Sequence, residues 1–129
     1  MKSLLNIIYY TTILLIITTC SDNVNKDLNE EKTWVFVACE GNFGASNGSI
    51  SMINELGEVY SVENVGDVVQ SVEVYENKLF VIVNNSSLIK AYDITEEGLS
   101  LPGIEISTDG SSPREMKVFN NKLYFTNWN

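Results

Sequence analysis

The side chains best suited to catalysis are scarce in this sequence. There is no histidine, which removes the commonest general base and the commonest ligand of transition metals. Calcium, held by Asp and Asn oxygens and backbone carbonyls, is the metal left as an alternative. The sequence therefore predicts no catalytic residue, no cofactor and no metal site. The carboxylates of interest lie in loops or at strand ends, without a recognisable ligand spacing: Glu40, Asp67, Asp93 and Asp109.

Side chains suited to recognition are easier to find, beginning with the loop Glu40–Gly48, EGNFGASNG. Three glycines, two asparagines and a serine surround Phe43, so a large apolar ring lies at the centre of a polar loop. Two interpretations are open. Either the ring faces a ligand, or it folds back onto the core while Asn47-Gly48 forms a hairpin turn.

The N-terminal residues predict an export signal. Met1-Lys2 provides a positive start, and the apolar run Leu4–Ile17 is too short and too interrupted for a membrane span. The segment Ile17–Cys20 resembles the lipobox of bacterial lipoproteins, with Thr19 in place of the usual Gly, Ala or Ser. We expect a signal peptide over residues 1–19, a lipidated Cys20 and a polar tether over residues 20–32. The alternative is an uncleaved membrane anchor.

The second cysteine, Cys39, then has no disulfide partner. It lies in the strand-like run WVFVAC. We expect it to be a small buried hydrophobic residue and not a reactive thiol.

The charge of the chain excludes some partners. The net charge is −9, and removal of Lys2 with the signal leaves 7 − 17 = −10 for the mature chain. A chain this acidic does not attract nucleic acid or anionic lipid through bulk electrostatics.

An internal repeat is the most informative pattern. VEVYENKLFVIVNN (Val72–Asn85) aligns with MKVFNNKLYFTNWN (Met116–Asn129) at an offset of 44 residues, and a further shift of 44 places Phe36 under Phe80. The complete period predicts four strands. They are Val69–Tyr75, Lys78–Val83, Leu88–Ile94 and Leu101–Ser107.

These strands define an all-β fold class. Asn120-Asn121 and Glu76-Asn77 suit tight hairpins, because Asn tolerates positive φ. Both faces of Lys78–Val83 are apolar, so its sheet must be stacked between two others. Four-stranded antiparallel sheets with a period of about 40 to 50 residues predict a β-propeller. A β-sandwich is the rival fold, but it does not explain the repeat.

The quoted motifs, together with EGNFGASNGSISMI, resemble YncE-like or YVTN-type β-propellers, especially the DUF5074-type surface lipoproteins of Bacteroidetes-type bacteria. The resemblance covers Trp34–Asn129. It implies a seven-bladed propeller on an outer-membrane lipid anchor. Some related propellers capture cobalamin at the cell surface and pass it to a transporter.

The repeat also suggests an incomplete domain over residues 33–129. Val35–Cys39 aligns with the second strand of a blade, and Asn129 follows the second strand of a third blade. We expect an N-terminal fragment, about two and a half blades of a protein of roughly 300 residues or more.

In such a propeller, the loops between second and third strands share a face with the connections between blades. That face would present aromatic rings beside amide groups, a suitable recognition surface. The structural alternative is that the amides satisfy loop backbone groups. The predicted ligand-binding residues are Asn42, Phe43, Asn47, Asn84, Arg114, Asn127 and Trp128.

These observations favour a lipid-anchored, non-enzymatic binding module on the cell surface or periplasmic face of the outer membrane. Its partner would be a small-molecule ligand or an outer-membrane transporter, with cobalamin-type uptake as one such role. One alternative is a propeller enzyme, a calcium-dependent lactonase or a quinone-dependent dehydrogenase, with its site in further blades. Another is a purely structural surface protein.

Overall fold

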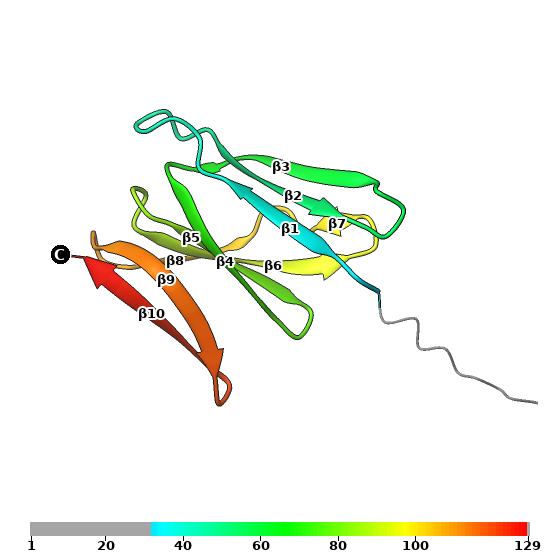
Figure 1. Ribbon diagram of the computed structural model, residues 1–129. Coiled ribbons are helices and arrows are strands. Elements are labelled where there is room, and N and C mark those ends of the chain that lie inside the picture. Colours follow the sequence, from blue (N-terminus) through cyan, green and yellow to red (C-terminus); the bar gives the residue numbers. More distant parts are fainter. Residues whose placement is uncertain (1–31, 129) are drawn as a thin grey trace, which may run out of the picture. The chain divides into compact units, whose positions relative to one another are not determined.

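The computed structural model describes residues 32–128, and every regular element within them is a β-strand. The strands form antiparallel sheets (Figure 1). The predicted all-β class is therefore confirmed. No helix in this part of the chain is long and apolar enough to cross a membrane. The predicted signal peptide, Cys20 and the tether up to residue 31 lie outside the described residues.

The first sheet has three strands in the order β1-β2-β3. They are β1 (Val35–Cys39), β2 (Gly48–Ile53) and β3 (Val59–Gly66). Because side chains alternate along a strand, one face of β2 carries Ile50 and Met52, which are fully buried. The loop Glu40–Gly48 thus connects the first two strands of this sheet, as the repeat predicts.

Cys39 is exposed, so the prediction that it is buried was wrong. The alternation of side chains places Cys39 on the same face of β1 as Val35 and Val37, and both valines are exposed. Phe36 and Ala38, on the opposite face, pack against the core. Within the described residues the outer face of β1 is left uncovered.

The second sheet is built on β4 (Val69–Tyr75), β5 (Lys78–Val83) and β6 (Leu88–Thr95). Two further strands, β7 (Gly98–Leu99) and β8 (Ile104–Ser107), both pair with β6. The first three strands have the predicted bounds to within one residue. The predicted strand Leu101–Ser107 begins only at Ile104, because Pro102 has no N–H group to donate to a strand ladder.

The third sheet is the hairpin of β9 (Ser112–Phe119) and β10 (Lys122–Trp128). Its turn residues Asn120 and Asn121 have φ angles of 48° and 57°, as predicted for a tight hairpin. The β4–β5 turn differs from the prediction, since the residue with positive φ is Glu76, at 52°.

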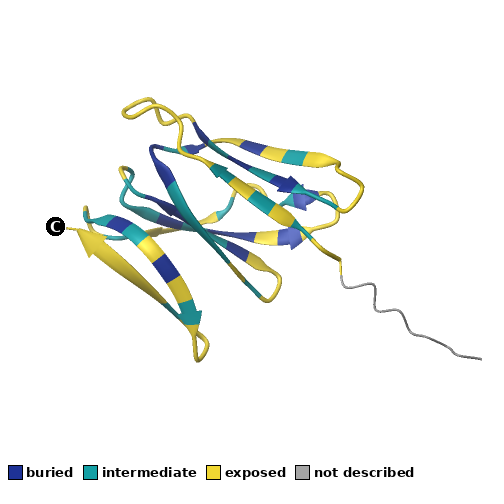
Figure 2. Ribbon diagram, in the orientation of Figure 1, coloured by how far each residue is buried: buried dark blue, intermediate teal, exposed yellow. Residues whose placement is uncertain are grey.

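Two apolar clusters pack the sheets against one another. In the first, Leu79, Val81 and Val83 of β5 join Ile50 and Met52 of the first sheet. In the second, Ile82 packs with Ile89 and with Met116 of β9, and Phe80 packs at its margin. The prediction that β5 is apolar on both faces because its sheet lies between two others is therefore confirmed. Figure 2 shows buried residues along β5 and β6, whereas β10 is largely exposed.

The sequence repeat coincides with a structural repeat. Shifting β4 and β5 by 44 residues gives 113–119 and 122–127, which match β9 and β10. Shifting β1 in the same way gives 79–83, which lies within β5. The offset therefore relates equivalent strands of successive sheets, and each sheet presents its loops in the same way.

Candidate functional site

Several loops that connect the strands lie together at one end of the strands, at the left of Figure 1. We call this region the loop end. Hydrogen bonds between the connections join them: the Asn84 amide donates to the Val68 carbonyl at 2.8 Å, and the Thr108 amide donates to the Ser87 carbonyl at 2.9 Å. The loop end comprises residues 40–48, 66–70, 84–87, 108–114 and 127–128.

Asp67 connects two of these loops. Only 6% of this residue is exposed, and its carboxylate accepts the Gly44 amide at 2.9 and 3.0 Å as well as the side-chain amide of Asn85 at 2.5 Å. Its own backbone N–H donates to the Ser86 hydroxyl at 3.0 Å, and its carbonyl accepts the Asn85 amide at 3.1 Å. A buried carboxylate with several donors is well satisfied and fixes the groups around it.

The loop that carries Phe43 is shaped by its own side chains. The side-chain oxygen of Asn47 accepts the Asn42 amide at 2.7 Å, so Asn47 holds the two arms of the loop together. Gly41 has a φ of 79°, and a Cβ there would lie 2.6 Å from that same oxygen, so only glycine fits. Asn47-Gly48 does not form a hairpin turn, because Gly48 is already the first residue of β2.

Phe43 lies at the tip of this loop with 82% of its surface exposed. The interpretation in which the ring folds back onto the core is therefore wrong. The amide of the next residue, Gly44, is held by Asp67. The exposed ring is thus carried by a backbone that is tied to the neighbouring loops.

The side chain of Asn84 satisfies a loop backbone group, which is the structural role given as the alternative to ligand binding. Its side-chain amide donates to the Pro113 carbonyl at 2.7 Å. At the positions 44 residues earlier, the Val69 amide donates to the Glu40 carbonyl at 3.3 Å. Proline has no N–H. Between the second and third sheets the hydrogen bond therefore runs in the opposite direction, from the Asn84 side chain to the Pro113 carbonyl.

Arg114 and Trp128 form a cation–π pair at the loop end. The guanidinium carbon of Arg114 lies 4.0 Å from the centre of the Trp128 ring, within cation–π distance. Trp128 is exposed, and Asn127, its neighbour on β10, pairs with Pro113. The Nε atom of Arg114 is buried and has no hydrogen-bond partner within the described residues.

The predicted site residues thus fall into two groups at the same end of the strands. Asn42, Phe43 and Asn47 share one loop, whereas the others gather where β9 begins and β10 ends. Asp67 and Asn84 join the intervening segments by the hydrogen bonds given above. The sequence marks Asp67 only as a loop carboxylate without ligand spacing, and the hydrogen bonds by which it joins the loops were not predicted. The only sequence signal for that role is its place directly after Gly66, the equivalent of Gly110.

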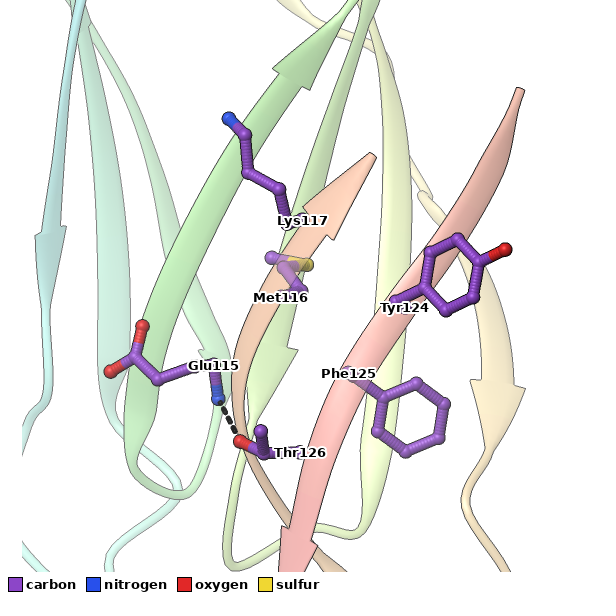
Figure 3. Close-up of a pocket in the computed structure, with 6 residues that line it drawn as sticks. All are labelled: Glu115, Met116, Lys117, Tyr124, Phe125 and Thr126. Carbon is purple, nitrogen blue, oxygen red and sulfur yellow. Dashed lines mark hydrogen bonds between the residues drawn. The ribbon is translucent and has the colours of Figure 1, made fainter. Parts of the chain in front are cut away.

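A metal-ligand cluster and a surface pocket are the other features that could mark a functional site. Residues 32–128 contain no group of three or more His, Cys, Asp or Glu side chains that could hold a metal ion. A pocket of about 250 Å³ lies instead on the β9–β10 hairpin (Figure 3). Its polar features are few, and the amide of Glu115 already donates to the Thr126 hydroxyl at 3.1 Å. The pocket is lined by Glu115, Met116, Lys117, Tyr124, Phe125 and Thr126.

The fold defines an all-β protein of stacked, repeated antiparallel sheets whose connections gather in the loop end. Comparison of the sequence with protein-family models and with curated proteins finds no match. The similarity to YncE-like and DUF5074-type lipoproteins therefore remains a prediction from the motifs.

Proposed function

We propose that this protein is a lipid-anchored, non-enzymatic binding module whose β-propeller blades present the loop end to a small molecule. Four observations support blades over a sandwich. The sheets stack face to face, the second sheet carries β4, β5, β6 and β8, β5 is buried on both faces, and a 44-residue offset relates successive sheets.

The observation that carries the binding proposal is the exposure of Phe43 on a fixed loop. An exposed aromatic side chain gains free energy when a ligand removes it from water. Its loop is tied by Asp67 and by Asn47, so little conformational entropy is lost on binding. A rigid loop with an exposed ring and nearby amides is suited to recognition and has no evident structural use for that ring.

The site of action in this proposal is the outer membrane, at the cell surface or facing the periplasm. Its support is the lipobox-like segment before Cys20, outside the described residues, and the resemblance to surface lipoproteins. A captured molecule would then be passed to an outer-membrane transporter. The same resemblance supplies the first probe, cyanocobalamin, whose flat ring and amide side chains suit aromatic and asparagine groups.

The test is equilibrium dialysis of cyanocobalamin against the purified full-length lipoprotein in detergent. We expect saturable binding, and we expect Phe43→Ala to weaken it by about tenfold, which corresponds to about 1.4 kcal/mol. Leu56→Ala is the matched control, because Leu56 is equally exposed, at 84%, but lies in the β2–β3 turn at the other end of the strands.

Two results would count against the proposal. Absence of saturable binding would remove cobalamin-type capture. Equal affinities of the Phe43→Ala and Leu56→Ala variants would show that the ligand binds elsewhere than at the loop end.

A further inference from the structure

Arg114 is unusual in this chain because it is the only arginine among 129 residues, 17 of which are acidic. The four ion pairs of the described residues all use lysine: Lys32–Glu96, Lys78–Asp93, Lys90–Glu105 and Lys117–Glu73. Arg114 takes part in none of them. A guanidinium that is half-buried without a carboxylate partner in so acidic a protein calls for a physical reason.

A β-bulge in β9 positions Arg114. The β9–β10 register shifts between Phe125 and Asn127, whose partners are Met116 and Pro113, so Arg114 and Glu115 form a bulge opposite Thr126. Bulges re-aim side chains and are common beside binding sites. The Thr126 hydroxyl accepts the Glu115 amide within this bulge, so the distorted backbone is satisfied.

The guanidinium of Arg114 lies over an aromatic ring. Trp128 lies 4.0 Å from the guanidinium carbon, and the carbonyl of the preceding residue, Pro113, is fixed by Asn84. Gln70 occupies the equivalent position 44 residues earlier, also at a register shift. The equivalent position is thus neutral in the second sheet, and the charge of Arg114 is particular to the third sheet.

The stacking leaves hydrogen-bonding capacity unused. A guanidinium has five N–H donors in a planar fork that matches the oxygens of a carboxylate or a phosphate. The Nε donor is buried without a partner, so the protein alone does not satisfy this fork. The net charge of −9 repels anions in general, which means that an anion would bind here only through directed donors.

We propose that Arg114, stacked on Trp128, binds the anionic oxygen group, carboxylate or phosphate, of the small molecule that the loop end recognises. This inference rests on the proposed function and adds the chemical class of the ligand. Trp128 has two tasks in it: it orients the guanidinium, and its exposed face covers the ring or chain that bears the anion.

The experiment uses tryptophan fluorescence of the purified protein carrying Trp34→Phe, which leaves Trp128 as the only tryptophan of residues 1–129. The probes are phenyl phosphate, benzoate and the neutral benzyl alcohol. We expect a saturable change with phenyl phosphate, with benzoate or with both. The relative affinity of the two probes shows whether the site prefers phosphate or carboxylate. We also expect Arg114→Gln to weaken it at least tenfold and Arg114→Lys to weaken it less. Lys122→Gln is the control, because it removes the same charge from an exposed position at the other end of β10.

Three results would overturn the inference. The first is an equal loss of affinity in the Arg114→Gln and Lys122→Gln variants, which would indicate bulk electrostatics. The second is binding of benzyl alcohol as tight as that of the anions, which would leave recognition by the loop end intact without an anion site. The third is no saturable change with either anion, in which case the cyanocobalamin titration alone decides the proposed function.

Discussion

Asp67 is the residue through which the loop end acquires a fixed shape. Its carboxylate accepts the Gly44 amide from one loop and the Asn85 side chain from another. The next residue, Val68, has a φ of 63°, which is costly for a β-branched side chain and persists only where surrounding contacts hold it. The hydrogen bonds of Asp67, together with the Asn84 amide that donates to the Val68 carbonyl, hold this strained turn.

We expect Asp67→Asn to destabilise the fold by about 1–3 kcal/mol, because one acceptor oxygen becomes a donor that faces other donors. The amide of Gly44 would also exchange its hydrogen faster. Urea denaturation and hydrogen exchange measure the two effects. Asp109→Asn is the control, since Asp109 is exposed and its φ of 55° suits Asn equally well. Equal effects of both changes would show that Asp67 does not organise the loops.

At this scale, sequence reasoning singles out side chains that lie exposed at the loop end, such as Phe43 and Trp128, but not the residue that orders the loops. Phe43 stands out because an aromatic ring in a glycine-rich loop is unusual. Asp67 does not stand out, because its partners lie 23 and 18 residues away in the chain. Which amides reach a carboxylate is decided by how the sheets stack.

Among the elements, the β9–β10 hairpin depends on one carboxylate of β4. Glu73 accepts the Lys117 ammonium at 2.7 Å and the Val118 amide at 3.2 Å, and only 15% of its side chain is exposed. The hydrogen bond from Lys117 is the main cause that lowers the pKa of Glu73 below its ordinary value of 4.5, although burial opposes the effect. The Tyr75 hydroxyl adds a bond to the Asn121 side chain at 2.7 Å.

The sign of the pH dependence follows from that shift. Since the pKa of Glu73 is lower in the folded state, its contribution to stability is present above 4.5 and is lost as the pH falls through the lower, folded value. We expect Glu73→Gln to cost about 1–3 kcal/mol at neutral pH. The difference from the wild type should shrink under acid, as measured by denaturation at both pH values.

Glu63→Gln provides the control for this prediction, because Glu63 is exposed on β3. Its effect should be small at either pH. A difference between the wild type and Glu73→Gln that stayed constant down to strong acid would mean that the charge of Glu73 does not attach the hairpin.

The elements themselves follow closely from the sequence, with exceptions that have local causes. A continuous apolar run between turn residues gives β5 its observed bounds, and the alternating valines Val72 and Val74 indicate β4. The positive φ at Glu76 could not be predicted from propensity, since the register Tyr75↔Lys78 imposes it. In this turn the pairing of the strands, and not the residue type, determines which residue has a positive φ.

For the molecule as a whole, the stacking of sheets decides which apolar residues stabilise the fold. The second sheet carries its apolar side chains on both faces. Cys39, Val35 and Val37 show the opposite case, because nothing in the described residues covers their face of β1. The sequence predicts that a strand is apolar, but the neighbouring sheet determines whether that face is buried.

The same substitution, Ile→Ala, at Ile82 and at Ile106 measures how much burial by a neighbouring sheet contributes to stability. Ile82 is fully buried and packs with Ile89 and Met116, whereas 51% of Ile106 on β8 is exposed. We expect Ile82→Ala to cost about 2–5 kcal/mol, because it removes buried surface and leaves a cavity. Ile106→Ala should cost about 1 kcal/mol or less, since water already reaches half of that residue. Urea denaturation with unchanged m-values measures both. If the two costs were equal, Ile106 would have to be buried in the protein in solution, and β8 would then be covered by structure beyond the sheets described here.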